Sequence, residues 1–149
     1  MTLTYDSMQS SPSYRAIPWP TAGTALAPSP LQVPERLQPL IDQLNELLAL
    51  RKGWNSYAAP EISIDACRRA LHLLIETQWD GPLPTTAPTT SGGVQLEWGG
   101  EDEGVELEFT PDNKLGVLID ADGRQREIWV DDIHHPEVFE ALTWARKFA

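Results

Sequence analysis

The sequence predicts a single α+β domain, made of two N-terminal helices, a four-stranded antiparallel meander and a C-terminal helix packed on one sheet face. Two observations predict this class. Apolar residues recur at three- and four-residue spacings between residues 34 and 78 and again after Pro136, which is the period of an amphipathic helix. Between Val94 and Val130 they alternate with polar residues in short segments separated by Gly, Asn and Asp, which is typical of hairpin-connected strands.

The chain of 149 residues is long enough for one domain with a core of ordinary size. Residues 1–30 are rich in Ser, Thr, Pro and Ala and show no sustained period, so we expect a disordered or loosely attached tail. Residues 31–149 then form the domain. Within the tail, residues 14–20 are locally apolar; we favour a passive tail, and docking of this segment on the domain or on a partner is the alternative.

The acidic composition restricts the classes of partner. The net charge is −11, and because binding to nucleic-acid phosphates or to an anionic membrane needs clustered Lys and Arg, both are disfavoured. A charged partner should be basic. No Lys or Arg lies between Trp79 and Asn113, where eight carboxylates fall. The ordinary explanation is a sheet face kept soluble by carboxylates, and the alternative is an acidic recognition surface.

Cysteine usage and hydropathy favour a cytoplasmic protein. Cys67 is the only cysteine, so an intramolecular disulfide and a cysteine-based zinc site are excluded. The N-terminus has no basic segment followed by an apolar one, and no window approaches the roughly 18 apolar residues that span a bilayer. We therefore expect neither secretion nor membrane insertion.

The first predicted helix covers residues 34–51. Pro39 is early enough to be tolerated or to shift the helix start inward, and Gly53 ends the helix. The second helix begins at Ser63 as its N-cap and ends near Gln78. Two amphipathic helices joined by a short loop predict an antiparallel pair.

Two connecting segments flank the second helix. The loop over residues 53–60 contains Trp54 and Tyr57, which are too large to be left in water without a reason, so we expect both to pin the loop to the core. Residues 80–90 are rich in Pro and Thr, and we expect an extended linker that leads to the sheet.

The four predicted strands are residues 94–98, 105–110, 115–120 and 125–130. Their alternation divides them into two faces. The apolar face, which the helices cover, contains Val94, Leu96, Trp98, Val105, Leu107, Phe109, Leu115, Val117, Ile119, Ile128 and Val130. The polar face contains Gln95, Glu97, Glu106, Glu108, Thr110, Arg126 and Glu127. Trp129 falls in the polar register, where it is exposed or covers an edge.

A last helix is predicted from Pro136, with a buried stripe of Val138, Phe139, Leu142, Ala145 and Phe148. Just before it, residues 131–135 bring two Asp and two His together. These residue types suit zinc or manganese, but strand-to-helix junctions often carry Asp and His as caps, and we favour the cap.

The other residues considered for catalysis have simpler explanations. Cys67 lies on the buried stripe of the second helix, where it acts as a small core residue rather than a nucleophile. Glu106 and Glu108 share a strand face, but we identify no apolar pocket to raise a pKa and expect solvated strand carboxylates. Residues 120–123 resemble the start of a calcium loop without its later ligands, and we expect a hairpin turn.

Two motifs carry a family resemblance. Residues 53–57 read Gly-Trp-Asn-Ser-Tyr, and residues 92–98 read Gly-Gly-Val-Gln-Leu-Glu-Trp. Between residues 48 and 119 the chain resembles an uncharacterised family of small bacterial proteins with a Gly-Trp-Asp-Gly-Tyr-like loop and a Gly-Gly-Val-x-Leu-Glu-Trp strand. Asn55 and Ser56 replace the usual Asp and Gly. The resemblance supports the architecture and implies no activity, catalytic residue or cofactor.

These observations favour a non-catalytic acidic module, similar in kind to antitoxins, immunity proteins or small inhibitors, that binds a more basic protein and needs no cofactor or metal. One alternative is a nucleic-acid mimic that inhibits a DNA-binding enzyme such as a nuclease. A second is a metal-dependent hydrolase built on His134, His135 and the neighbouring aspartates. The predicted partner-binding residues are Trp54, Tyr57, Glu97, Glu101, Asp102, Glu103, Glu106, Glu108 and Trp129.

Overall fold

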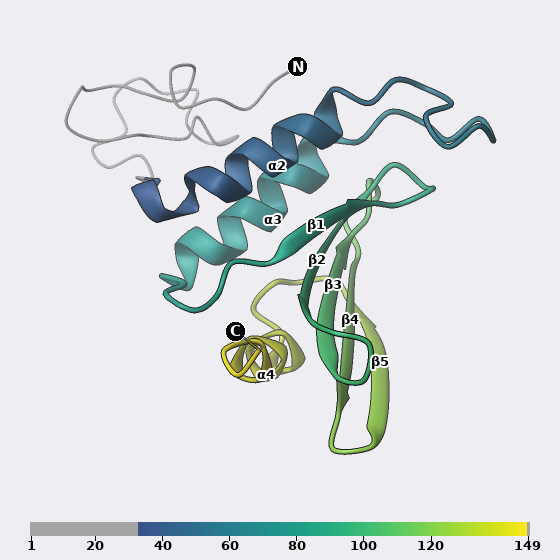
Figure 1. The fold of residues 1–149 in the computed structure, drawn as a ribbon. Coiled ribbons are helices and arrows are strands. Elements are labelled where there is room, and N and C mark those ends of the chain that lie inside the picture. The colour runs from purple at the N-terminus through teal and green to yellow at the C-terminus, as the bar shows by residue number, and fades with distance from the viewer. Residues whose placement is uncertain (1–32, 149) are drawn as a thin grey trace.

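A computed structural model describes residues 33–148 and shows an α+β fold in which helices cover one face of an antiparallel sheet (Figure 1). The predicted tail over residues 1–30, with its apolar segment 14–20, lies outside the described residues. Two helices are followed by five strands in the spatial order β1-β2-β3-β4-β5 and then by a last helix. The α+β class and the order of the elements are confirmed, but the sheet has one strand more than predicted.

Proline placement determines where the first helix begins. A short 3-10 turn, η2 (Glu35–Leu37), precedes α2 (Gln38–Leu48), which has Pro39 in its first turn. A proline has no N–H to donate but is tolerated there, so the regular helix starts four residues after Pro34. It also ends three residues before the predicted end, at Leu48.

The second helix, α3 (Ile64–Glu76), begins as predicted. Ser63 is its N-cap, and the Ala66 N–H donates to the Ser63 hydroxyl oxygen at 3.1 Å. The helix ends where the chain turns through Gln78, which has a φ of 51°. Cys67 lies in the core, as predicted, and burial raises its pKa to about 12.

The additional strand comes from the predicted linker. β1 (Thr85–Pro88) pairs antiparallel with β2 (Val94–Gly99), from Thr85 opposite Glu97 to Pro88 opposite Val94. A proline is acceptable at the sheet edge because no neighbouring strand needs its missing N–H. The prediction of an extended connection was therefore correct in conformation, but it missed that this segment joins the sheet.

The remaining strands form the predicted meander: β3 (Gly104–Phe109), β4 (Leu115–Ala121) and β5 (Arg124–Val130). The β4–β5 connection is a two-residue turn in which Asp122 and Gly123 both have positive φ, which confirms a hairpin turn at residues 120–123. Trp98 of β2 is buried, as predicted, beside Trp79, and both indoles donate to the Pro82 carbonyl at 2.8 Å.

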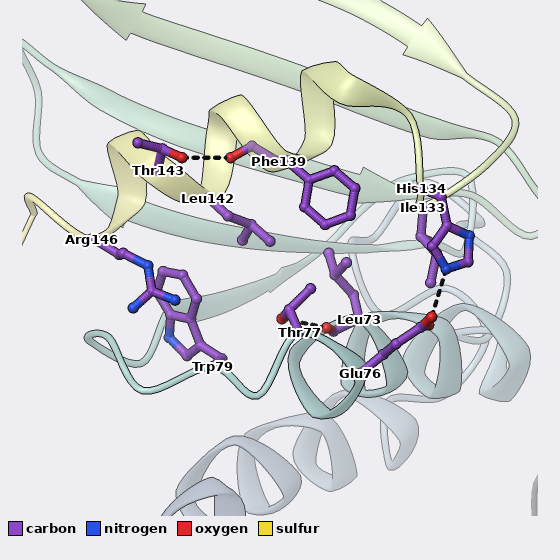
Figure 2. Close-up of a pocket in the computed structure, with 10 residues that line it drawn as sticks. All are labelled: Leu73, Glu76, Thr77, Trp79, Ile133, His134, Phe139, Leu142, Thr143 and Arg146. Carbon is purple, nitrogen blue, oxygen red and sulfur yellow. Dashed lines mark hydrogen bonds and ion pairs between the residues drawn. The ribbon is translucent and has the colours of Figure 1, made fainter.

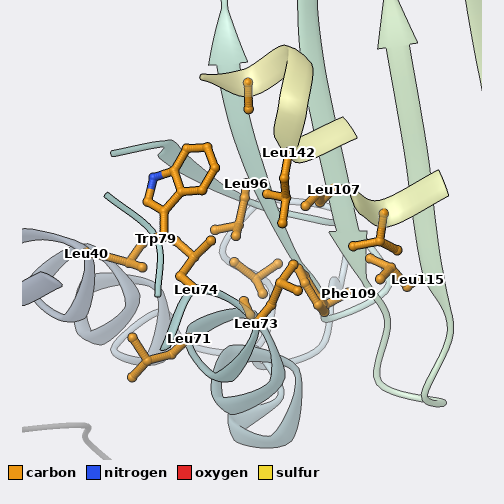
Figure 3. Close-up of a cluster of buried hydrophobic side chains, with 14 of the residues drawn as sticks. Leu40, Leu71, Leu73, Leu74, Trp79, Leu96, Leu107, Phe109, Leu115 and Leu142 are labelled. Atoms are coloured by element: carbon orange, nitrogen blue, oxygen red, sulfur yellow. The ribbon is translucent and has the colours of Figure 1, made fainter. Parts of the chain in front are cut away.

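The core lies between the sheet and the helices (Figure 3). α3 packs on β2 and β3, while α4 (Pro136–Ala145) packs on β3 and β4. Because α4 does not extend over β5, two residues predicted to be buried are exposed: Ile128 on β5 by 37% and Phe139 on α4 by 45%. Arg126 was assigned to the polar face, but it lies opposite Ile119 and therefore on the helix side.

Within residues 33–148, no helix combines the length and the apolar character needed to cross a bilayer.

Candidate functional site

The sheet face opposite the helices gathers carboxylates from four strands. We call it the outer face. Alternation along each strand places these residues on it while their neighbours fill the core. The outer face of β2–β5 consists of Gln95, Glu97, Glu106, Glu108, Gly116, Leu118, Asp120, Gln125, Glu127 and Trp129.

One row across the outer face is almost entirely acidic. Glu97 lies directly opposite Glu106, Glu106 opposite Leu118, and Leu118 opposite Glu127. Like charges directly opposite each other on neighbouring strands are destabilising. The row therefore places two carboxylates directly opposite each other and a third beyond a single apolar side chain.

The neighbouring row ends in an exposed aromatic ring. Glu108 lies opposite Gly116, and Gly116 lies opposite Trp129. A Cβ atom on Gly116 would come within 2.9 Å of the Trp129 ring, so the indole lies on the bare backbone of this glycine. The ring is 48% exposed and borders a small hollow of about 80 Å³ that Glu106, Glu108 and Glu127 also line. This arrangement confirms that Trp129 faces the polar side.

The strands provide no cation to balance these charges on the outer face. Arg124 and Arg126 are the only basic residues in the five strands, and both point to the helix side. There Arg126 forms ion pairs with Glu140 at 2.7 Å and Glu137 at 3.5 Å on α4. Beyond the strands, Lys114 lines a hollow together with Glu108 and Trp129 and lies 3.8 Å from Asp131.

Two of the carboxylates are less solvated than predicted. Desolvation, followed by the charges of Glu97, Glu108 and Glu127, raises the pKa of Glu106. Desolvation and the charge of Glu127 likewise raise the pKa of Glu108. The sequence pattern alone does not reveal surroundings that would desolvate these carboxylates. Leu118 and Trp129 provide such surroundings, because both line the hollow of about 80 Å³ together with Glu106 and Glu108.

Three other predicted carboxylates lie at the end of the sheet. Glu101, Asp102 and Glu103 form the exposed turn between β2 and β3. Glu103 accepts the Asp122 N–H at 3.0 Å and so links this turn to the β4–β5 turn. These residues extend the acidic surface beyond one edge of the outer face.

The aromatic loop is separate from the outer face. Trp54 packs partly against the core and donates its indole N–H to the Pro60 carbonyl at 3.2 Å. Tyr57 is 86% exposed, so the prediction that it pins the loop to the core was wrong. Asn55 stabilises the loop instead, because its side-chain oxygen accepts hydrogen bonds from the backbone N–H groups of Tyr57 and Ala59.

A second hollow, of about 340 Å³, lies between α3 and α4 (Figure 2). Leu73, Phe139 and Leu142 form its apolar wall, and Figure 2 shows His134 and Glu76 together at one side. The pattern of the sequence does not reveal this hollow, because His134 and Glu76 are 58 positions apart.

His134 belongs to a set of ion pairs. Its ring nitrogens lie 2.6 Å from Glu76 and 2.9 Å from Asp132, and the bonds to these carboxylates raise its pKa. His135 is the N-cap of α4 and accepts the Glu137 N–H, which confirms the capping role. Within residues 33–148, no three His, Cys, Asp or Glu side chains are arranged to hold a metal ion.

Comparison of the chain with models of known families, with curated proteins and with solved structures finds no match. The family resemblance of the loop at residues 53–57 and the strand at residues 92–98 stays a prediction.

Proposed function

We propose that the protein is a non-catalytic acidic module that binds a more basic protein through its outer face. The observation that carries the proposal is the combination on one sheet face of carboxylates from four strands with an exposed tryptophan and no strand cation. The carboxylates are Glu97, Glu106, Glu108, Asp120 and Glu127.

Solubility alone does not account for how these carboxylates are placed. A solubilising charge is most effective when it is fully hydrated, whereas Glu106 and Glu108 are partly desolvated and repelled by neighbouring carboxylates. A basic side chain that docked between them would relieve this repulsion on binding. Such charge complementarity increases the association rate and selects for partners of opposite charge.

Trp129 adds a means of selecting arginine. Its ring lies against Gly116 with three carboxylates around the adjoining hollow. A guanidinium group can stack on an indole face and bond to a carboxylate at the same time. We therefore expect arginine side chains of the partner to contribute more binding energy here than lysine side chains.

The absence of an activated nucleophile among the described residues supports a binding role. Cys67 is buried, with a pKa of about 12, and is far from being a thiolate at neutral pH. The carboxylates of the outer face have no nucleophile or histidine on the same face. The outer face is therefore suited to binding a partner rather than to catalysis.

A pull-down from the source cell tests the proposal. The tagged chain is compared with a variant that carries Glu97→Gln, Glu106→Gln, Glu108→Gln and Glu127→Gln. A control variant removes the same number of charges from exposed positions on the helical side: Glu35→Gln, Asp42→Asn, Glu46→Gln and Glu61→Gln.

We expect a basic protein to be retained by the wild type and the control at low salt, and to be lost with the outer-face variant or at high salt. Equal retention by all three chains would contradict the proposal. Displacement of DNA from the retained protein would favour the nucleic-acid mimic, since a mimic must occupy the DNA site.

A further inference from the structure

The two edges of the sheet differ in how they are protected. At the β1 edge, Gln43 of α2 accepts the Thr86 N–H at 3.0 Å and donates to the Pro84 carbonyl at 3.4 Å. One side chain thus occupies the backbone groups that another strand would use. β1 is also short and ends in Pro88, and both features discourage pairing with another chain.

The β5 edge has none of these features. Within residues 33–148, β5 pairs only with β4, and Figure 1 shows no element of this part of the chain on its other side. Six of its seven residues are exposed, and its register with β4 runs without a bulge from Arg124 to Val130. The strand contains no proline or lysine. A long, regular and uncovered edge is a template for pairing with another strand.

The alternation of the ladder determines which backbone groups are available. The two-residue turn closes on the Ala121–Arg124 pair, which exchanges both hydrogen bonds in such a hairpin. Every second residue from Arg124 onward therefore bonds to β4. The backbone N–H and C=O groups of Gln125, Glu127 and Trp129 consequently point away from β4 toward the free edge.

β5 exposes one large apolar side chain on each face of the sheet. Ile128 lies on the helix side, where α4 does not cover it, and Trp129 lies on the outer face. β5 is also the least acidic strand of the meander, because it has two arginines and one glutamate. Among residues 33–148, no helix covers this edge and keeps a second chain from it.

We infer that a second copy of this chain pairs with β5, antiparallel and related by a two-fold axis at Ile128, so that the two sheets become one. If the two sheets are to share continuous faces, residues on the same side of each sheet must lie opposite each other. Few registers with two-fold symmetry meet this condition. An axis at Glu127 would place the Glu127 residues of the two copies opposite each other, and an axis at Arg126 would do the same with the two Arg126 residues. Both registers would therefore pair like charges.

The axis at Ile128 avoids both conflicts. It places the two Ile128 side chains against each other, Glu127 opposite Trp129 of the second copy, and Arg126 opposite Val130. The paired segment runs from Arg126 to Val130, because β5 ends at Val130 and the chain bends at the next residue. An axis at Trp129 would leave a shorter overlap of the two strands. The inference does not depend on the proposed function, although it would join the two outer faces into one surface.

Cross-linking tests the register directly. In this arrangement the backbone groups of Ile128 bond to β4, so the two Ile128 residues form a non-hydrogen-bonded pair with Cα atoms about 4.5 Å apart. That separation is within the range of disulfides. We expect Ile128→Cys to give a cross-linked dimer with a mild oxidant, whereas Glu127→Cys stays largely monomeric. Cys67 is buried and does not compete. Efficient cross-linking of Glu127→Cys, or none of Ile128→Cys, would overturn the register.

Sedimentation equilibrium of the whole chain tests the dimer itself. We expect a species of twice the 16.6 kDa chain mass at micromolar concentrations and physiological salt. Glu127→Pro removes an N–H that faces the free edge and none that bonds to β4, so it should give a folded monomer by circular dichroism. Glu127→Gln is the matched control and should stay dimeric. A monomeric wild type, or a dimer that withstands Glu127→Pro in a folded chain, would overturn the inference.

Discussion

Replacing Glu106 by glutamine should stabilise the fold at neutral pH. Glu106 lies directly opposite Glu97, and desolvation together with the surrounding carboxylates raises its pKa. A carboxyl group whose pKa is raised by folding destabilises the folded state when it is ionised. Glutamine has nearly the same shape and no charge, so the variant removes the repulsion while it keeps the packing.

The structure sets the size of this effect. Side chains directly opposite on antiparallel strands have Cβ atoms about 5 Å apart, and like charges there cost roughly 0.2–1 kcal/mol. Two further carboxylates, Glu108 and Glu127, add to the repulsion, while solvent screening at this partly exposed position reduces it. We expect Glu106→Gln to raise the free energy of unfolding by about 0.5–1 kcal/mol, and Tm by about 2–4 °C for a domain of this size.

Thermal and urea denaturation at several values of pH and salt measure the effect. The gain should be complete at pH 7 and should vanish below the ordinary carboxyl pKa of 4.5, where Glu106 is protonated in both states. It should shrink in 1 M salt, where the Debye length is about 3 Å. Glu46→Gln, at an exposed position on α2, is the control and should change little. A variant that is less stable, or a gain that is independent of both pH and salt, would refute the reasoning.

Three further predictions concern single residues. Gly116→Ala should displace the ring of Trp129, seen as altered fluorescence and weaker partner binding, whereas Gly100→Ala, with open space around it, should change neither. Because folding raises its pKa, His134 contributes stability that is complete below its ordinary pKa of 6.5 and is lost as pH rises through its pKa in the folded state. The difference in Tm between wild type and His134→Ala should therefore narrow with rising pH. A difference that stays constant with pH would contradict this prediction. Cys67 should react with a thiol reagent only after unfolding, and rapid labelling of the native chain would show that its burial is wrong.

Features determined by neighbouring residues along the chain could be predicted from the sequence. Ser63 caps its helix because capping involves residues only three positions apart. Trp98 is buried because the two-residue period of a strand assigns its face once one neighbour is placed. The turn at Asp122 and Gly123 follows from residue types that tolerate positive φ.

Features that depend on contacts between distant segments could not be predicted. β1 has no alternating pattern of its own, and it becomes a strand because β2 pairs with one edge and Gln43 occupies the other. The two-residue period of β5 would have placed Arg126 on the helix side, but its ion pair with Glu140 of α4, which accounts for a charge on that side, joins distant segments. The exposure of Phe139 depends on how far α4 extends over the sheet, which no local pattern encodes.

The candidate site was predicted in composition but not in arrangement. Alternation correctly placed Glu97, Glu106 and Glu108 on one face. Which carboxylates lie opposite each other depends on the register of three hairpins, and the seating of Trp129 on Gly116 depends on the β4–β5 pairing. Trp54 and Tyr57 were grouped with this surface because they are large aromatic residues, but the contacts of Trp54 stay within the loop and the core.

The most direct test of the central claim is a titration of the retained basic partner against three chains at low and physiological salt. These are the wild type, the four-fold glutamine variant of the outer face and the control variant of the helical side. If the outer face is the binding surface, the dissociation constant should rise at least tenfold for the outer-face variant, equivalent to about 1.4 kcal/mol, and stay near the wild-type value for the control. Equal weakening of both variants would show that net charge alone attracts the partner, and an unchanged affinity of the outer-face variant would contradict the claim.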